Sequence, residues 1–227
     1  MQIGLIGEGA IGRYVMEQLR LRGLRPQFIL TRSDHVPDHS GDAPTYVRSV
    51  SDLPSELALM VDCAGHSALA QHGASILERG TDLVTLSLGA LADETLAFEL
   101  ARAAERGSAR LHLASGAIGA LDCLRAAKVG GLETVTYTGR KPPKGWKGSA
   151  AENVLDLDSL QEAAMHFQGN ARDAAVRYPK NANVAAAVAL AGQGFDETRV
   201  ELIADPMIAS NIHEVHASGA FGSLHFR

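Results

Sequence analysis

The 227-residue chain has only two cysteines, one tryptophan and 5% aromatic residues. Cys63 and Cys123 are too few for a disulfide framework or a cysteine-ligated zinc site, so we expect two reduced thiols and no bound metal. No apolar run reaches the roughly 18 residues that a membrane-spanning helix needs. The N-terminus does not show a basic segment followed by an apolar one, which argues against a secretory signal and favours a cytoplasmic protein.

The chain also lacks a strong excess of one charge. It has 21 Lys and Arg against 26 Asp and Glu, a net charge of −5. This balance argues against nucleic acid or an anionic membrane as the main partner. Hydrophobic residues make up 46% of the chain, which excludes a disordered protein and is enough for the core of one or two domains.

Apolar runs alternate with helical patterns over residues 1–115. We expect strands at 2–6, 27–30, 45–47, 57–61, 82–86 and 109–114, with helices at 11–22, 67–79 and 93–106. Short buried strands separated by helices are typical of a doubly wound parallel sheet. The first domain, residues 1–115, is therefore predicted to be an α/β domain of the Rossmann type.

The pattern changes after Ser115. We expect helices at 118–127, 160–167, 171–178 and 184–191, and strands at 132–140, 199–204 and 211–221. The stretch 132–140 alternates small or apolar residues with threonines, as a half-buried strand does. Residues 116–227 are therefore predicted to form a second, α+β domain with an antiparallel or mixed sheet covered by helices.

A glycine motif follows the first strand and opens the first helix. Its residues are Gly7, Glu8, Gly9, Ala10, Ile11 and Gly12, in the pattern GxGxxG. In this context Gly7 allows a tight turn, Gly9 lets a pyrophosphate approach the backbone, and Gly12 lets the helix pack on the strand. Backbone N–H groups at the helix start, including those of Ala10 and Ile11, would then hold the phosphates. The alternative is a glycine-rich turn without a ligand.

The end of the second strand indicates which dinucleotide is bound. An NAD site usually has an acidic residue about 20 residues after the motif, where this chain has Thr31, Arg32 and Ser33. Arg32 could pair with a 2′-phosphate and Ser33 could add a hydroxyl bond, which favours NADP with NAD also usable. Alternatively, Arg32 is a solvated surface residue and Asp34 binds the ribose.

Small residues also end the strand at 57–61. Cys63, Ala64 and Gly65 would let the nicotinamide ribose lie against the backbone, because ligands bind at the carboxyl ends of parallel strands. Asp62 and His66 are more simply explained as helix caps.

Longer motifs in both halves resemble the L-aspartate dehydrogenase family. They are CAGH at 63–66, SGAIGALD at 115–122, KVGGLETVTYTGRKPP at 128–143, YPKNANVAA at 178–186 and NIHEVHASGAFG at 211–222. The resemblance implies oxidation of L-aspartate to iminoaspartate, which hydrolyses to oxaloacetate and ammonia or feeds NAD biosynthesis. It implies that His213 is catalytic and that Ala117 and Asn183 contact the cofactor. We also expect a homodimer formed by the second domain, and a C-terminus shorter than the family's.

The residues themselves support these roles less specifically. His213 shares a strand face with Val215 and could accept a proton near neutral pH, or could be an ordinary core histidine. A dicarboxylate substrate needs cations, and Lys180 is the first candidate, followed by Arg140 and Lys141. Asn183 could bind the substrate or the nicotinamide amide, or help to cap a helix. For Lys141 and Lys144 we prefer the alternative interpretation, a solvated loop charge.

Two alternative functions stay open at this point. One is a related NADP-dependent dehydrogenase or reductase that acts on another amino acid or on a semialdehyde. The other is a catalytically inactive NADP-binding protein, which would bind the dinucleotide without turning over a substrate.

Overall fold

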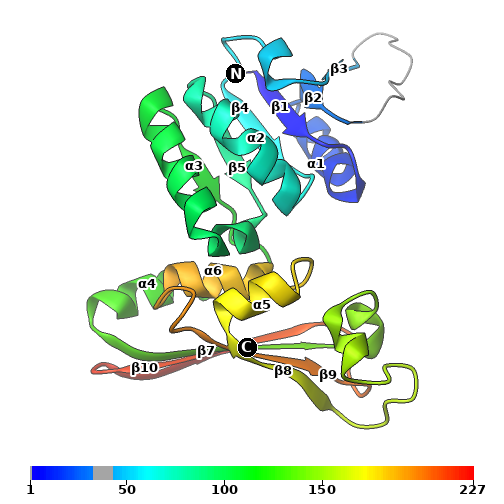
Figure 1. The fold of residues 1–227 in the computed structure, drawn as a ribbon, viewed down its shortest axis with the longest axis vertical. Helices are drawn as coiled ribbons and strands as arrows, with labels where there is room; N and C mark the ends of the chain where they lie inside the picture. Colours follow the sequence, from blue (N-terminus) through cyan, green and yellow to red (C-terminus); the bar gives the residue numbers. More distant parts are fainter. Residues whose placement is uncertain (1, 33–42) are drawn as a thin grey trace. The chain divides into compact units, whose positions relative to one another are not determined.

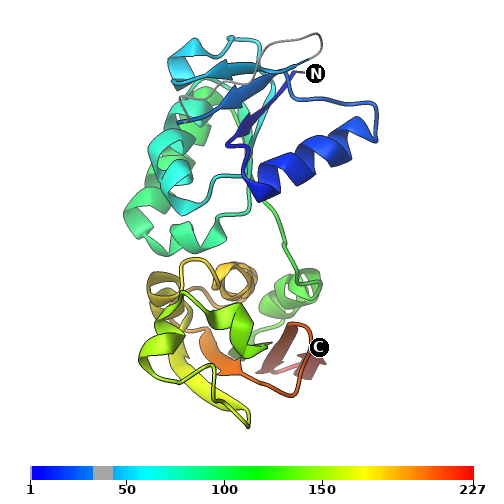
Figure 2. The ribbon, with the colours of Figure 1, turned by 90° about the vertical axis from the view of Figure 1, so that its right-hand side faces the viewer.

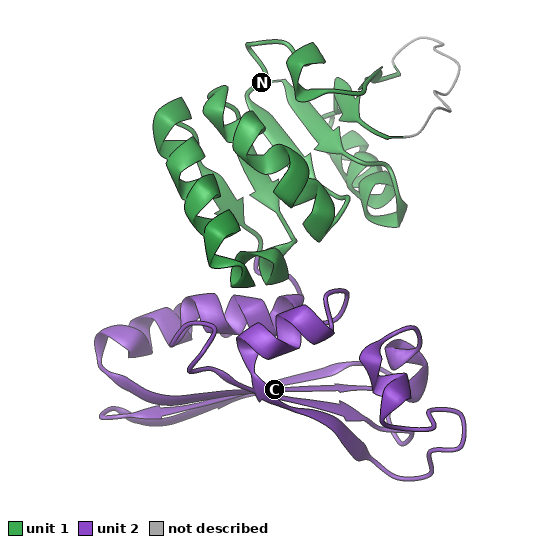
Figure 3. Ribbon diagram, in the orientation of Figure 1, with its two compact units in different colours: residues 1–114 green, residues 115–227 purple. Residues whose placement is uncertain are grey.

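The computed structural model describes residues 2–32 and 43–227, which form two compact units, 1–114 and 115–227 (Figure 3). Ser33 and Asp34, which the sequence suggests for nucleotide binding, lie outside the described residues. Within the described ranges, no helix is both long enough and apolar enough to cross a membrane.

The first unit contains a six-stranded sheet with the order β3-β2-β1-β4-β5-β6. All neighbouring strands pair in parallel. The strands are β1 (Ile3–Ile6), β2 (Phe28–Leu30), β3 (Thr45–Val47), β4 (Leu59–Asp62), β5 (Asp82–Thr85) and β6 (Leu111–Leu113). This order confirms the doubly wound sheet, and it reverses between β1 and β4, the point where such sheets bind ligands.

Three helices cover this sheet. They are α1 (Ala10–Arg20), α2 (His66–Glu78) and α3 (Glu94–Gly107). Figure 2 shows α1 on one face of the sheet and α2 and α3 on the other. The helix α3 starts where the Asp93 carboxylate accepts the backbone N–H groups of Thr95 and Leu96, an N-cap that satisfies two otherwise unpaired donors.

The second unit contains a five-stranded mixed sheet with the order β11-β10-β7-β9-β8. Its strands are β7 (Leu132–Lys141), β8 (Ala164–Asn170), β9 (Arg199–Ala204), β10 (Ile212–Gly219) and β11 (Gly222–Phe226). Only β7 and β9 are parallel neighbours. The helices α4 (Leu121–Val129), α5 (Ala171–Arg177) and α6 (Asn183–Ala191) lie along one face of this sheet (Figure 1). The predicted α+β fold is thus confirmed.

The register of β7 and β10 decides which side chains meet. Gly139 pairs with His213, and Tyr137 pairs with Val215. Because side chains alternate along a strand, these four residues belong to one face of the sheet, together with Val135. This is the helix-covered face, since Gly192 at the end of α6 lies against Val135.

Two predicted elements differ from the structure. The predicted helix at 160–167 is wrong, because Ala164–Asn170 forms β8. An irregularity in the pairing with β9 lies between Met165 and Phe167, so that His166 and Phe167 are both buried and the two-residue alternation is lost. The predicted strand 211–221 corresponds to β10, which ends at Gly219, and the structure adds the unpredicted strand β11, whose first residue, Gly222, has φ +103°.

Candidate functional site

The glycine loop connects β1 to α1. Gly7 has φ +80°, and a Cβ added there would lie 2.9 Å from the Cβ of Ala64. A Cβ at Gly12 would lie only 2.4 Å from the carbonyl oxygen of Gly7. At Gly9, in contrast, an added Cβ meets nothing within 4 Å. Gly7 and Gly12 are therefore required by the protein's own packing, whereas Gly9 keeps open space beside the helix start, as a bound pyrophosphate needs.

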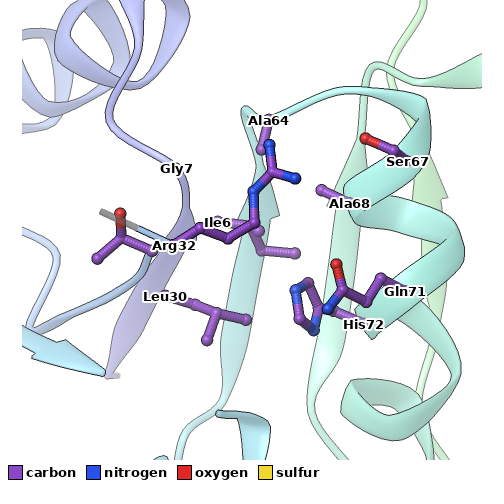
Figure 4. Close-up of a pocket in the computed structure, with 10 residues that line it drawn as sticks. Ile6, Gly7, Leu30, Arg32, Ala64, Ser67, Ala68, Gln71 and His72 are labelled. Atoms are coloured by element: carbon purple, nitrogen blue, oxygen red, sulfur yellow. The ribbon is translucent and has the colours of Figure 1, made fainter. Parts of the chain in front are cut away.

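A cavity of about 250 Å³ lies at the carboxyl ends of β1 and β2 and beside α2. Its lining residues are Ile6, Gly7, Leu30, Thr31, Arg32, Ala64, Ser67, Ala68, Gln71 and His72. In Figure 4 the Arg32 side chain extends from the end of β2 toward Ala64, while Gln71 and His72 project from α2. Burial, and then the charge of Arg32, lower the pKa of His72. The cavity thus presents one cation beside a neutral imidazole.

The predicted cofactor residues of this unit fall into three groups. Gly7, Arg32 and Ala64 line the cavity. Gly9, Ala10, Ile11 and Gly12 form the loop and the first turn of α1. Gly65, at φ +94°, starts α2, and Cys63 is buried with its thiol pKa raised to about 11 by burial and by Asp62. Sequence reasoning missed Ser67, Gln71 and His72, although their spacing at i, i+4 and i+5 after a strand end places them on one helix face.

Asp62 organises the turn between β4 and α2. Its buried carboxylate accepts the backbone N–H groups of Ala64 and Gly65 at 3.0 and 3.2 Å. It also accepts the hydroxyl groups of Thr85 and Ser87 at 2.8 and 2.6 Å. Four hydrogen bonds use the lone pairs of this carboxylate, so Asp62 has a structural role in the turn. The interpretation of Asp62 and His66 as helix caps is wrong, because the N-cap of α2 is Gly65, without a side-chain cap hydrogen bond, and His66 is the first residue of the helix.

A second cavity, of about 460 Å³, lies within the second unit. It brings together Ala117 and His213, two residues that the family resemblance selects. Its lining residues are Ala117, Ile118, Gly119, Ala120, Asn211, Ile212, His213, Phe226 and Arg227. The turn before α4 and the start of β10 therefore form one hollow around the imidazole.

Tyr137 holds the ring of His213. Its hydroxyl oxygen lies 2.8 Å from Nδ1 of His213, and the two rings are stacked at 19°. Gly139, between Tyr137 and the strand end, makes this contact possible, because a Cβ there would lie 2.7 Å from the Tyr137 hydroxyl. Burial raises the pKa of Tyr137, so its hydroxyl stays protonated. With Nδ1 engaged, Nε2 is the ring nitrogen left for a substrate.

Two cations lie near His213, Arg227 in the lining of the same cavity and Lys141 at the end of β7. Burial, and then the charge of Lys141, lower the pKa of His213, so the imidazole is neutral at neutral pH. Lys141 differs from the solvated loop charge expected from the sequence. It is the last residue of β7 and half-buried, its pKa is lowered by burial, and its Nζ donates to Oδ1 of Asn181 at 2.7 Å.

The other predicted substrate residues lie apart from this cavity. Arg140 pairs with Asp205 at 3.0 Å, and its position next to Gly139 puts it on the opposite face of β7 from His213. Lys180 is exposed in the segment before α6. Asn183 is half-buried as the first residue of α6. None of these three lines the cavity that contains His213.

His216 has a different environment from His213, although both are on β10. It points to the opposite face, and its ring stacks on His225 of β11 at a centroid distance of 3.8 Å. This cross-strand pair fits the structural role expected for it.

A doubly wound sheet with a GxGxxG loop, next in the chain to a unit with a neutral, oriented imidazole, defines a dinucleotide-dependent dehydrogenase. Comparison with known proteins agrees with this class. Residues 7–114 match the family model described as "Homoserine dehydrogenase, NAD binding domain", and residues 122–227 match that described as "Aspartate dehydrogenase, C-terminal".

Individual relatives specify the family further. The chain is 52% identical over 230 residues to the L-aspartate dehydrogenase of Ruegeria pomeroyi, covering 100% of this chain and 82% of the relative. It is 46% identical to the L-aspartate dehydrogenase of Pseudomonas aeruginosa, covering 99% and 86%. The crystal structure of aspartate dehydrogenase from Thermotoga maritima matches with a TM-score of 0.79 and 29% identity, covering 100% and 88%. The chain belongs to the L-aspartate dehydrogenase family, and its cofactor is NAD or NADP.

Proposed function

We propose that this chain oxidises L-aspartate at C2, with NAD or NADP as the hydride acceptor, to iminoaspartate. Hydrolysis of iminoaspartate then gives oxaloacetate and ammonia, and the same site could aminate oxaloacetate in reverse. The observation that supports this proposal most directly is the neutral His213, held through Nδ1 by Tyr137 in a cavity that also contains Ala117. The substrate in this proposal is taken from the relatives named L-aspartate dehydrogenase.

The residues of the first unit fit a dinucleotide. The open space at Gly9 would admit the pyrophosphate, and the N–H groups of the first α1 turn, which have no partner within the helix, would hold it. When bound, the cofactor supplies the hydride acceptor. The residues that we propose to contact it are Gly7, Gly9, Ala10, Ile11, Gly12, Arg32, Ser33, Cys63, Ala64, Gly65, Ala117 and Asn183.

Arg32 favours NADP over NAD. Its guanidinium lies in the cavity at the end of β2, where a 2′-phosphate is expected in this fold. A guanidinium binds a phosphate through two parallel hydrogen bonds, whereas the ribose hydroxyls of NAD are bound best by a carboxylate. The described end of β2, residues 30–32, contains no carboxylate.

His213 would exchange the substrate's proton. Hydride leaves C2 only from the neutral amine, so the substrate ammonium must first give up a proton. The lowered pKa of His213 keeps the imidazole in the form that accepts one at Nε2. The Tyr137 hydroxyl can accept the Nδ1–H of the ring before and after this transfer, so the ring keeps its orientation.

The remaining expectations are proposals that rest on the family resemblance. Lys180, Arg140 and Asn183 are candidates for binding the substrate, although Arg140 would first have to give up its ion pair with Asp205. We also propose a cytoplasmic homodimer formed by the second unit. In that setting the iminoaspartate product would feed NAD biosynthesis.

The test is a turnover assay of the purified protein, followed by the absorbance of the reduced nicotinamide. L-Aspartate should be oxidised with either cofactor, and L-homoserine and L-glutamate should react far more slowly. His213→Ala should lower kcat by about 10²- to 10⁴-fold, the usual contribution of a general base, with unchanged dinucleotide affinity. His216→Ala on the same strand is the control and should keep full activity. Tight dinucleotide binding without aspartate turnover would contradict the proposal.

A further inference from the structure

The alternation along β7 places a cation beside His213. Tyr137, Gly139 and Lys141 share the face of the strand that pairs with His213, while Arg140 points to the other face. Arg140 pairs with Ile212, so Lys141 and Asn211 are the next positions on the two neighbouring strands. Asn211 lines the same cavity as His213. Lys141 therefore lies at the edge of the candidate substrate site.

Neutral groups hold the Lys141 side chain in place. Its Nζ donates to the amide oxygen of Asn181 at 2.7 Å and lies 4.7 Å from the centroid of the buried Trp146 ring. Gly145 packs against its stem, since a Cβ at Gly145 would lie 3.3 Å from the Lys141 Cβ. An amide and an aromatic face orient an ammonium group without neutralising it.

No acid in the described ranges compensates this charge. The unit's other half-buried cations have carboxylate partners, Arg140 with Asp205 and Arg172 with Asp196, but no carboxylate lies within 4.0 Å of Lys141 in the part of the chain that the structure describes. The charge of Lys141 contributes to lowering the pKa of His213 and that of the buried His166. Burial lowers the pKa of His166 to about 4, so it adds no charge of its own. A half-buried ammonium surrounded only by neutral groups is costly unless an anion joins it.

We propose that Lys141 is the residue that binds a carboxylate of the dicarboxylate substrate, an inference that rests on the function proposed above. The neutral Asn181 amide and Trp146 ring leave the ammonium charge of Lys141 available to pair with an incoming anion. Its place at the end of β7 brings that anion beside the imidazole of His213. Lys141 is thus the specificity-determining residue, in place of Lys180 and Arg140, the candidates that the sequence favours over it.

The test compares Lys141→Met with the wild-type protein and with Lys144→Met, a control at an exposed lysine of the following turn. A charge-assisted hydrogen bond to a carboxylate accounts for a factor of about 10 to 100, so KM for L-aspartate should rise by that factor in Lys141→Met. Succinate, used as an unreactive dicarboxylate, should bind to Lys141→Met more weakly by about the same factor. Dinucleotide affinity should not change, and Lys144→Met should behave as wild type.

Charge retention separates binding from a merely structural role. Lys141→Arg keeps the cation, and its KM should stay within a few-fold of the wild-type value. If Lys141→Met does not fold, Lys141→Gln replaces it, because the Gln amide can still donate to Asn181. An unchanged KM and unchanged succinate binding in the neutral variant, or equal losses in the Arg and neutral variants, would overturn the assignment of Lys141. An absence of aspartate turnover in the wild-type protein would instead overturn the proposed function.

Discussion

Deleting the Tyr137 hydroxyl tests whether His213 depends on its partner. In Tyr137→Phe the ring still fills its buried site, because Tyr137 is only 1% exposed and loses a single oxygen. Nδ1 of His213 loses its 2.8 Å hydrogen bond, so the imidazole can turn away from the orientation that presents Nε2. The change therefore removes orientation while leaving both the imidazole and the packing of the sheet in place.

The expected magnitude follows from the strength of one neutral hydrogen bond. Such a bond contributes about 0.5–1.5 kcal/mol, and about 1.4 kcal/mol of barrier corresponds to tenfold in rate. If the bond is fully used in the transition state, kcat should fall about 2- to 10-fold with little change in dinucleotide affinity. Thermal unfolding should move down by about 2–4 °C, the shift expected for ~1 kcal/mol in a chain of this size.

Gly139→Ala reaches the same hydrogen bond from the other side. Its methyl group would lie 2.7 Å from the Tyr137 hydroxyl, which must move away from His213. Because both substitutions break one interaction, their effects on kcat should not add, and the double variant should be about as active as either single variant. Tyr178→Phe is the control, since it deletes a comparable buried hydroxyl that pairs with Nδ1 of His166 at 3.0 Å. It should lose stability but keep kcat.

Steady-state kinetics of the four proteins in the cycle, with Tyr178→Phe alongside, measure this coupling. Fully additive effects of Tyr137→Phe and Gly139→Ala would refute the shared hydrogen bond. A Tyr137→Phe variant with wild-type kcat would show that the ring of His213 is oriented by something else.

Three further predictions concern the cofactor and pH. Arg32→Ala should weaken NADP binding about 10- to 100-fold more than NAD binding, the factor for a charge-assisted phosphate contact, and calorimetric titration that finds an unchanged ratio would remove Arg32 from the site. Gly9→Val should abolish dinucleotide binding with little change in thermal stability, since no atom lies within 4 Å of a Cβ added there. Gly12→Ala should lower both dinucleotide affinity and thermal stability, because its Cβ would lie 2.4 Å from the Gly7 carbonyl oxygen. The acid limb of the kcat/KM profile should lie below pH ~6.5, the ordinary histidine pKa. Burial and the charge of Lys141 lower the pKa of His213, so its base form persists to lower pH. An acid limb above pH ~6.5 would contradict the buried, Lys141-facing environment of the imidazole.

Local patterns in the sequence were sufficient for the nucleotide-binding unit. The glycine motif between a strand and a helix, and short buried strands separated by helices, depend only on neighbouring residues, so the parallel sheet and the phosphate loop could be predicted. The predicted helix at 160–167 failed because the irregularity in β8 between Met165 and Phe167 removes the alternation by which a strand is recognised.

The contacts of His213 could not be predicted in the same way. Tyr137 and His213 are 76 residues apart, and only the pairing of Gly139 with His213 brings them together. For Lys141 the signal was present, because the alternation of Val135, Tyr137 and Gly139 continues to residue 141. Lys141 was nevertheless interpreted as a solvated loop charge, because the two prolines that follow make it look like part of a loop.

His213, Tyr137 and Lys141 all belong to two adjacent strands of one sheet, β7 and β10. Backbone hydrogen bonds between these strands, rather than mobile loops, therefore fix the spacing of the chemical groups. A new substrate preference could evolve through exchanges at the strand ends alone, without disturbing the unit that recognises the nucleotide. The glycine loop and the strands that hold His213 and Lys141 thus lie in separate stretches of the chain.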